Sequence, residues 1–322
     1  MPLGEFDLIA RYFTRAPRRA VLGIGDDCAL LAPLPTGQQL AVSSDMLVEG
    51  RHFLSTVAPE RLGHKALAVN LSDLAACGAE PLAFTLALAM PRIDEAFLAG
   101  FSRGLFALAD EHAIELVGGD TTAGPLAVCI TVFGSVPVGQ ALLRSGAQAG
   151  DDLWVSGTLG DARLALEVFR GTQSVAEHAF ETLRRRMELP APRVALGLAL
   201  RRVATSAIDL SDGLTGDLAH LLARSAVGAT VDADALPRSA ALASMPLAVQ
   251  RECGLAGGDD YELLFTAPTS NESAVRAAGE AAGVAVTRIG RVESTHGLRI
   301  VAADGSGLSQ AFAGFDHFAG NP

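Results

Sequence analysis

Aspartates recur in glycine- or serine-rich segments of this chain, and this recurrence constrains the fold more than any other feature. Most of these segments lie next to a short apolar run that predicts a strand, so we expect their carboxylates to project from strand ends, in turns. The segments are Gly23–Asp27, Ser43–Asp45, Asn70–Asp73, Gly118–Thr122 and Asp209–Gly213, with a further acidic stretch at Gly257–Leu263.

Convergence of these carboxylates would create strong repulsion. Two bare carboxylates about 4 Å apart repel by about 4 kcal/mol in the dielectric of a protein edge. Hard cations relieve this repulsion, and an oxygen-only ligand set without Cys or His is the set that Mg²⁺ prefers. The acidic segments therefore predict a magnesium site.

Strands and helices alternate along the whole chain, which predicts an α/β protein. Strands are expected near 39–43, 82–90, 114–118, 126–138, 153–155, 206–210, 229–232, 261–266, 284–292 and 298–302. Helices are expected near 4–13, 61–77, 94–112, 159–170, 177–187, 192–203, 214–225, 239–251 and 271–282. The 322 residues suffice for two domains. The glycine-containing segment before the strand at 153 indicates a junction, so we expect domains at 1–138 and 151–322 with a linker at 139–150.

The composition excludes several classes of protein. Hydrophobic residues make up 49% and charged residues 19% of the chain, which favours a globular protein over a disordered one. The net charge of −11 argues against a nucleic-acid partner. The longest apolar stretches are far shorter than the roughly 20 residues that span a bilayer, and no signal peptide is visible. The four cysteines are widely spaced, which suits a reducing compartment. A cytoplasmic protein without a membrane partner is expected.

Together, the motifs resemble those of thiamine-monophosphate kinases, a family within the aminoimidazole-ribonucleotide-synthetase-like group. The resemblance covers nearly the whole chain and rests on the order and spacing of the acidic segments, of Lys65–Ala76 and of Arg144–Ala147. It implies two mixed-sheet α/β domains, the first pairing its sheet across a homodimer and the second closing the active site. It also implies transfer of phosphate from ATP to thiamine monophosphate, the last step of thiamine diphosphate synthesis, with several Mg²⁺ ions.

The resemblance also implies roles for individual residues. The metal ligands would be Asp27, Ser43, Ser44, Asp45, Asp73, Asp120, Asp209 and Asp212. The ATP contacts would be Gly119, Asp120, Arg144 and Ser211. The thiamine monophosphate contacts would be His52, Glu262 and Phe315. One departure is mild: Asp259 stands where the family often has Glu.

The residue chemistry agrees with such a reaction. The chain contains no G-x-x-x-x-G-K-[ST] loop and no protein-kinase signature. A phosphate acceptor with a second pKa of about 6 is largely dianionic at pH 7 and needs no general base. We therefore assign no catalytic base. Arg144 suits a phosphate clamp, Glu262 a counter-charge to the thiazolium cation, and Phe315 a π face for that cation.

Simpler interpretations exist for single motifs. Ser211 and Asp212 precede a helix and are typical N-caps, Asp73 is typical of a polar helix face, and Arg184–Arg186 predicts a solvated face without a ligand. Among functions, a purine-pathway synthetase of the same group is the nearest alternative enzyme. A non-catalytic protein that binds nucleotide or divalent cations is the alternative of a different class.

Overall fold

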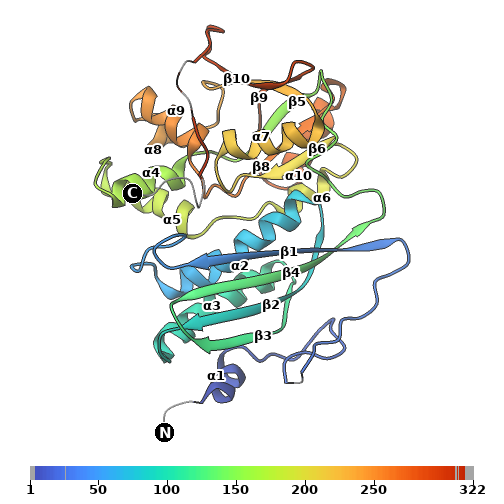
Figure 1. Ribbon diagram of the computed structural model, residues 1–322, viewed down its shortest axis with the longest axis vertical. Helices are drawn as coiled ribbons and strands as arrows, with labels where there is room; N and C mark the ends of the chain where they lie inside the picture. The colour runs from blue at the N-terminus through green and yellow to red at the C-terminus, as the bar shows by residue number, and fades with distance from the viewer. Residues whose placement is uncertain (1–3, 26, 309, 311, 316–322) are drawn as a thin grey trace. The chain divides into compact units, whose positions relative to one another are not determined.

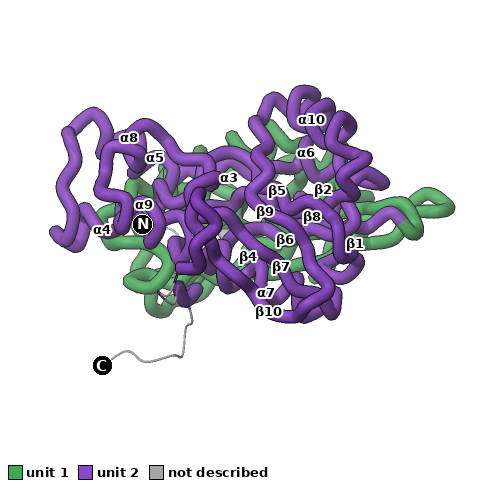
Figure 2. The backbone as a smooth tube through the Cα atoms, turned by 90° about the horizontal axis from the view of Figure 1, so that it is seen from above, with its two compact units in different colours: residues 1–74, 79–139 green, residues 75–78, 140–322 purple. Residues whose placement is uncertain are grey.

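The computed structural model describes residues 4–25, 27–308, 310 and 312–315. The chain forms two compact units, shown in Figure 2. Unit 1 comprises Met1–Leu74 and Ala79–Gly139, and unit 2 comprises Ala75–Gly78 and Gln140–Pro322. The segment 140–150 of the expected linker thus belongs to unit 2.

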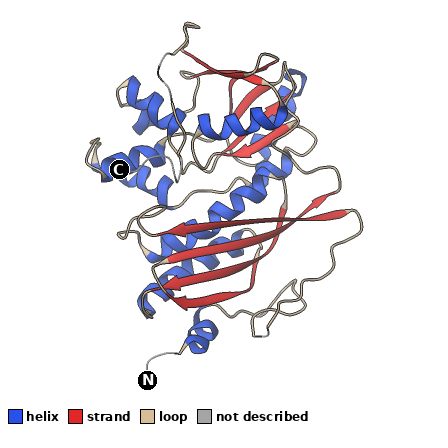
Figure 3. Ribbon diagram, in the orientation of Figure 1, coloured by secondary structure: helices blue, strands red, loops and turns tan. Residues whose placement is uncertain are grey.

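Unit 1 is built on a four-stranded mixed sheet with the strand order β1-β4-β2-β3 (Figure 1). Its elements are α1 (Glu5–Tyr12), β1 (Gln38–Val48), α2 (Pro59–Ala76, whose last two residues belong to unit 2), β2 (Glu80–Met90), α3 (Glu95–Glu111), β3 (Glu115–Ala123) and β4 (Ala127–Pro137). Strands β2 and β3 are parallel and are joined through α3, whereas β4 is antiparallel to both β1 and β2. Helices α2 and α3 lie on one face of this sheet (Figure 3).

Two glycines allow α2 and α3 to pack closely. A Cβ atom at Gly63 would lie 2.0 Å from the carbonyl oxygen of Phe101, and one at Gly104 would lie 1.8 Å from that of Glu60. No side chain fits in such gaps, so backbone meets backbone at this crossing. The sheet face under the helices is apolar and buried, with Phe84, Leu88 and Ile130 in its core.

The opposite face of the same sheet carries exposed apolar side chains. On β1 the exposed fractions of Leu40, Val42 and Met46 are 50%, 56% and 56%. These residues alternate with half-buried or buried ones along the strand, as the two-residue period of a strand requires. Unit 1 therefore presents an apolar sheet surface, which we call the open face.

Unit 2 contains a six-stranded sheet with the order β10-β7-β9-β5-β8-β6, in which only β10 and β7 pair in parallel. Its strands are β5 (Asp152–Ser156), β6 (Ser206–Asp209), β7 (Gly228–Asp232), β8 (Leu263–Ala267), β9 (Val286–Glu293) and β10 (Gly297–Val301). Its helices are α4 (Asp161–Phe169), α5 (Glu177–Glu188), α6 (Val194–Ala199), α7 (Leu214–Ser225), α8 (Ala240–Ala243), α9 (Leu247–Ala256), α10 (Glu272–Ala281) and a 3-10 turn at Thr269–Asn271.

Two buried apolar clusters stabilise unit 2. The larger one joins α7 to the sheet through residues such as Leu218, Leu221, Val155 and Ile289. The smaller one joins α4, α5, α8 and α9 and includes Leu183. Two mixed-sheet α/β domains were expected, and this fold class is confirmed. Across the described residues, none of the helices is both long and apolar enough to cross a bilayer.

Several local predictions were wrong. Ser43–Asp45 and Gly118–Thr122 are not turns, because β1 continues to Val48 and β3 continues to Ala123. β1 pairs with β4 and β3 pairs with β2, and this pairing outweighs the local turn preference of Ser, Asp and Gly. The single helix expected at 239–251 is two helices, since Pro246 interrupts it.

Candidate functional site

Three of the predicted metal ligands lie where β1 packs against α2. The Ser43 hydroxyl donates to Asp73 Oδ2 at 2.5 Å. The Asp45 backbone N–H donates to Asn70 Oδ1 at 3.0 Å, and Asn70 is three residues before Asp73 on the same helix face. Ser43 and Asp45 share one side of β1, because residues i and i+2 of a strand point the same way. We call Ser43, Asp45 and Asp73 the β1–α2 group.

Ser44 belongs to the other side of the sheet. Its hydroxyl is 2.9 Å from Thr131 Oγ1 and donates to the Ile130 carbonyl at 3.2 Å. Adjacent residues of a strand point in opposite directions, so the side chains of Ser43 and Ser44 do not meet at one point.

Asp27, Gly119 and Asp120 line a common pocket of about 580 Å³. Apolar side chains form much of its wall, including Ile9, Phe13, Ile24 and Leu116. Gly119 has φ +146°, and a Cβ atom there would lie 1.8 Å from the Leu86 carbonyl oxygen, so only glycine fits. A pocket that combines apolar walls with two carboxylates suits a ligand that is partly apolar and partly phosphorylated.

Strand register separates this pocket from the β1–α2 group. Asp45 pairs with Ile130, which pairs with Leu86, and Leu86 pairs with Gly119. These residues cross the whole sheet, so Asp45 and Asp120 are on its two edge strands, about 14 Å apart at about 4.8 Å per strand. Among the described residues, no three His, Cys, Asp or Glu side chains form a group that could hold a metal ion.

Glu115, at the start of β3, organises the chain that leads to the pocket wall. Its Oε1 atom accepts the backbone N–H groups of Arg18 and Arg19 at 2.8 and 2.6 Å, and Oε2 accepts that of Ala20 at 3.3 Å. The segment that follows contains Ile24, Gly25 and Asp27 of the pocket. Asp26 lies outside the described residues.

His52 follows β1 and is half-buried. Its Nδ1 atom accepts the Val48 backbone N–H at 2.9 Å. A neutral imidazole that accepts at Nδ1 carries its proton on Nε2. Lys65, which is buried, donates to the His52 carbonyl oxygen at 3.2 Å, so the backbone at this position is fixed as well.

In unit 2, the acidic loops gather at one edge of the six-stranded sheet. Strand β6 ends at Asp209, and its antiparallel neighbour β8 begins at Leu263, the residue paired with Asp209. The loop after β6 and the loop before β8 therefore meet. The Asp259 N–H donates to the Ser211 carbonyl oxygen at 2.9 Å, and the Tyr261 N–H donates to the Leu210 carbonyl oxygen at 2.8 Å.

The loop before β8 is strained. Asp259 and Tyr261 have φ values of +67° and +49°, in the left-handed region that non-glycine residues rarely adopt. Such strain is concentrated at functional sites. Phe315 joins the same region, because its N–H donates to the Asp212 carbonyl at 2.8 Å, and its side chain is 48% exposed.

Asp217, in the first turn of α7, holds the loop after β6. Its Oδ2 atom accepts the backbone N–H groups of Ser211, Asp212 and Gly213, each at 3.1 Å. Burial raises the pKa of Asp217 to about 7, and the nearby Asp212 carboxylate adds to the rise, whereas the three N–H groups oppose it. Asp209 is also buried.

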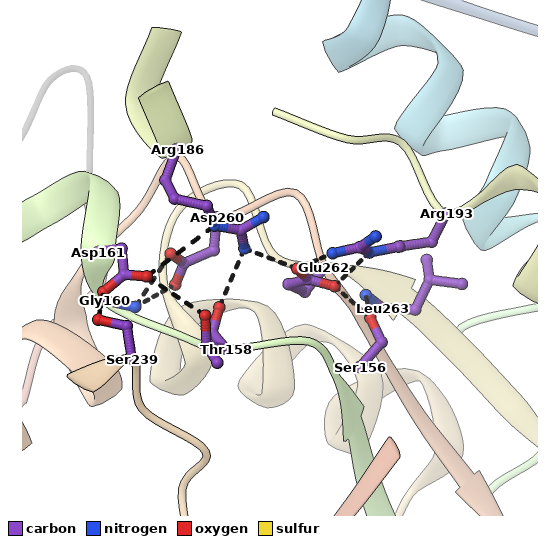
Figure 4. Close-up of polar contacts among 10 residues, drawn as sticks. All are labelled: Ser156, Thr158, Gly160, Asp161, Arg186, Arg193, Ser239, Asp260, Glu262 and Leu263. Carbon is purple, nitrogen blue, oxygen red and sulfur yellow. Dashed lines mark hydrogen bonds and ion pairs between the residues drawn. The ribbon is translucent and has the colours of Figure 1, made fainter. Parts of the chain in front are cut away.

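Glu262 is the centre of a buried ionic cluster (Figure 4). Its oxygens accept from Arg193 Nε and Nη2 at 2.6 and 2.5 Å, from Arg186 Nη2 at 2.7 Å and from Ser156 Oγ at 2.6 Å. Four donors match the acceptor capacity of a carboxylate. A Cβ atom at Gly157 would lie 2.1 Å from Glu262 Oε1, so the backbone approaches closely too.

Arg186 corrects the prediction that Arg184–Arg186 is a solvated face. Its side chain is only 23% exposed and, besides Glu262, approaches Asp161 at 4.0 Å. Asp260 accepts the Gly160 N–H with both oxygens at 3.0 Å. Burial raises the pKa of Asp260 well above its usual range, and burial also raises that of Asp161. The sequence pattern did not predict the buried ion pair of Arg186, because three adjacent arginines look alike in sequence. Only contacts with residues distant in sequence distinguish Arg186 from its neighbours.

Arg144, the predicted phosphate clamp, is exposed. Its carbonyl oxygen accepts from Ser225 Oγ at 2.9 Å, which ties its backbone to the end of α7.

Comparison with known proteins agrees with the division of the chain into two units. Residues 25–136 match the N-terminal domain and residues 148–303 the C-terminal domain of AIR synthase related proteins. A thiamine-monophosphate kinase from Salmonella typhimurium is 47% identical over 326 residues, covering 99% of both chains. The chain belongs to the thiamine-monophosphate kinase family.

Solved structures of thiamine-monophosphate kinases share the fold. The crystal structure of the enzyme from Stenotrophomonas maltophilia K279a has a TM-score of 0.84 and 47% identity, covering 94% of this chain and 95% of that one. The complex of AaThiL with AMPPCP and TMP has a TM-score of 0.77 and 30% identity, covering 89% of this chain and 90% of that one. Residues that hold loops in place through backbone N–H groups, as Glu115 and Asp217 do here, carry no local sequence motif, which explains why sequence reasoning missed both.

Proposed function

We propose that this chain phosphorylates thiamine monophosphate with ATP, producing thiamine diphosphate and ADP, the last step of thiamine diphosphate synthesis. The observation that carries the proposal is the full-length match, at 47% identity, to thiamine-monophosphate kinases. The complex of a 30% identical relative with AMPPCP and TMP supports the pair of substrates.

The reaction needs no protein base. An oxygen of the acceptor phosphate attacks the γ-phosphorus of ATP, the bond from that phosphorus to the β–γ bridging oxygen breaks, and ADP leaves with that electron pair. The acceptor is already largely dianionic at pH 7, since its second pKa is about 6. The task of the protein is to bring two polyanions together and to keep them in line.

The acidic residues fit Mg²⁺ by their chemistry. Every proposed ligand offers oxygen, and in unit 1 Ser43 and Asp73 already touch. We propose that Asp27, Ser43, Ser44, Asp45, Asp73, Asp120, Asp209 and Asp212 hold these ions. Bound Mg²⁺ would neutralise phosphate charge. Because Asp45 and Asp120 are on opposite edges of one sheet, and because Ser43 and Ser44 point to opposite sides, the ions would be several and not one.

The nucleotide contacts follow from two places in the structure. In unit 1, the pocket beside Gly119 and Asp120 combines apolar walls with carboxylates. In unit 2, Ser211 lies in the loop held by Asp217, and Arg144 presents an exposed guanidinium. We propose these four residues as ATP contacts, with Arg144 as the phosphate clamp.

For thiamine monophosphate we propose His52, Glu262 and Phe315. The ring of Phe315 is 48% exposed, and we propose that it presents a π face to the thiazolium. Glu262 differs from its expected role, because Arg186 and Arg193 already neutralise it. Direct contact with the thiazolium would require one arginine to leave, so we propose that Glu262 shapes this site through the ionic cluster.

We further propose a homodimer that pairs through the open face of unit 1. Three exposed apolar side chains of β1, which are unusual on a solvated sheet, support it. A cytoplasmic setting remains our prediction for the location.

A coupled assay of ADP release tests the function. Turnover should require ATP, Mg²⁺ and thiamine monophosphate together. Asp45→Asn and Asp120→Asn should each abolish turnover, because each removes a charged oxygen from a proposed Mg²⁺ ligand, and the thermal transition should remain. ATP binding without ADP release under any acceptor would favour a nucleotide-binding protein instead, and turnover with a purine precursor would favour a synthetase.

A further inference from the structure

The Asp217 carboxylate makes an uncommon set of contacts. A single oxygen, Oδ2, accepts three successive backbone N–H groups, from Ser211 to Gly213, at equal distances of 3.1 Å. The side chain is buried, with the residue only 4% exposed. A carboxylate is costly to bury without hydrogen-bond donors. The three N–H groups therefore stabilise the buried Asp217 carboxylate, and the carboxylate in turn holds the backbone of the three residues.

This contact differs from the usual cap of a helix, which accepts N–H groups of the first turn. The N-cap residue is Gly213, with φ +111°, and it has no side chain to accept the first free N–H groups. Asp217 reaches back from inside the helix instead. The N–H groups it accepts precede the helix, so the contact orients the loop as well as the helix end.

The carbonyl side of the same loop is held independently. The Ser211 carbonyl accepts from Asp259 at 2.9 Å, and the Asp212 carbonyl accepts from Phe315 at 2.8 Å. Glycine makes this approach possible, since a Cβ atom at Gly258 would lie 2.5 Å from the Ser211 carbonyl oxygen. With N–H and C=O groups both fixed, the directions of the Ser211 and Asp212 side chains are fixed as well.

We propose that Asp217 is a positioning residue that orients Ser211 and Asp212 toward nucleotide and Mg²⁺. The inference rests on the proposed function, in which these two residues contact ATP and metal. Asp217 itself touches neither ligand in this assignment. Its effect should therefore appear in nucleotide and Mg²⁺ binding and much less in thiamine monophosphate binding.

The matched control is Asp232 in the same unit. Its Oδ1 atom accepts the backbone N–H groups of Asp234 and Ala235 at 2.9 and 3.2 Å, at the end of β7. The chemistry is the same, an aspartate oxygen holding successive N–H groups, but no proposed ligand lies in that turn. Asp232→Ala should lower thermal stability and leave both Michaelis constants within twofold of the parent protein.

The experiment measures KM for ATP, KM for thiamine monophosphate and the rise in Tm caused by MgCl₂ plus a non-hydrolysable ATP analogue. We expect Asp217→Ala to raise KM for ATP at least tenfold, to change KM for thiamine monophosphate less than threefold, and to lose most of the Tm rise. Asp217→Asn keeps one acceptor oxygen without the charge and should raise KM for ATP at least threefold. If Asp217→Ala does not fold, Asp217→Asn alone serves as the test of the proposal.

A KM for ATP within twofold of the parent protein in Asp217→Asn, with the Tm rise intact, would overturn the proposal and leave Asp217 with only a structural role in the loop before α7. An equal increase in KM for ATP in the Asp232 and Asp217 variants would overturn the proposal too, because it would indicate that lower stability alone weakens ATP binding. Failure of the parent protein to release ADP would count against the proposed function and not specifically against Asp217, since the Tm rise still reports on nucleotide binding.

Discussion

Ser43 on β1 donates a hydrogen bond of 2.5 Å to Asp73 on α2, and this contact joins two segments that are 30 residues apart. The bond places a hydroxyl and a carboxylate side by side on the face of β1 that also carries Asp45. Strand and helix each contribute one partner, so the geometry depends on the packing of α2 against the sheet. A ligand group on two regular elements is held more firmly than one on a loop.

Asp73→Asn should abolish Mg²⁺-dependent ADP release and leave thermal stability within about 1 kcal/mol of the parent protein, the size of an ordinary hydrogen bond. The amide still accepts from Ser43 but no longer offers a charged oxygen to a cation. Steady-state kinetics at several Mg²⁺ concentrations check this result. Ser43→Ala, as the comparison, should reduce turnover less. Unchanged kinetics in Asp73→Asn would remove it from the metal ligands.

Phe315→Ala should raise KM for thiamine monophosphate by about 2- to 30-fold, the range that corresponds to a cation–π contact of about 0.5–2 kcal/mol. KM for ATP should stay constant, because the exposed ring is proposed to face only the thiazolium. The backbone N–H that binds Asp212 is retained in the variant. Equal increases in both constants would argue against stacking on the cation.

Glu262→Gln should destabilise unit 2 by about 3–5 kcal/mol, the usual effect of leaving buried charges without their partner. Arg193 would lose its pairing with Glu262, and Arg186 would keep only its longer approach to Asp161. Urea unfolding followed by Trp154 fluorescence measures the change. Glu272→Gln, which breaks an exposed ion pair with Arg276, is the control and should cost less than about 1 kcal/mol.

Asp260→Asn should make stability less dependent on pH. The folded-state pKa of Asp260 is raised, so between the unfolded value of about 3.9 and the folded value the native state binds more protons than the unfolded state. Its contribution to stability therefore decreases as pH rises through that window. Asn mimics the protonated carboxyl and still accepts from Gly160. Its Tm relative to the parent protein should increase from pH 5 to pH 8, and parallel Tm curves would contradict the assignment.

Val42→Lys should shift the chain from dimer to monomer in sedimentation velocity. The side chain is 56% exposed on the open face, and a lysine there would be buried without a partner on pairing. Leu247→Lys changes a residue of similar exposure, 49%, on unit 2 and should leave the mass unchanged. A parent protein that sediments as a monomer would refute the proposed interface.

Much of the fold could be predicted because periodicity and breakers mark its elements. The apolar run at 82–90 and the helix at 94–112 were located within two residues, as β2 and α3. The end of β1 was misplaced because Ser43–Asp45 has the composition of a turn, whereas its alternation with Val42 and Met46 continues the strand. The composition of Ser43–Asp45 favoured a turn, but pairing with β4 keeps these residues in the strand.

The site was less predictable, for a different reason. The family motifs supply Asp120 and Glu262, but the arginines that neutralise Glu262 lie 69 and 76 residues away in sequence. Asp217 resembles any acidic residue in the first turn of a helix. Side chains whose partners are backbone groups or distant residues become visible only through three-dimensional contacts.

Residues 75–78 have a practical consequence for dissecting the protein. This stretch comprises the end of α2 and the turn after it, and it belongs to unit 2. Arg201 Nε donates to the Gly78 carbonyl oxygen at 2.6 Å. The backbone of Ala75 lies close to Gly197, where a Cβ atom would be 2.0 Å from the Ala75 carbonyl oxygen. A fragment that starts at residue 140 would lack this stretch and leave the backbone around Gly197 bare. Expression of the second half by itself should give an aggregation-prone product, and a tethered copy of 75–78 should restore its solubility.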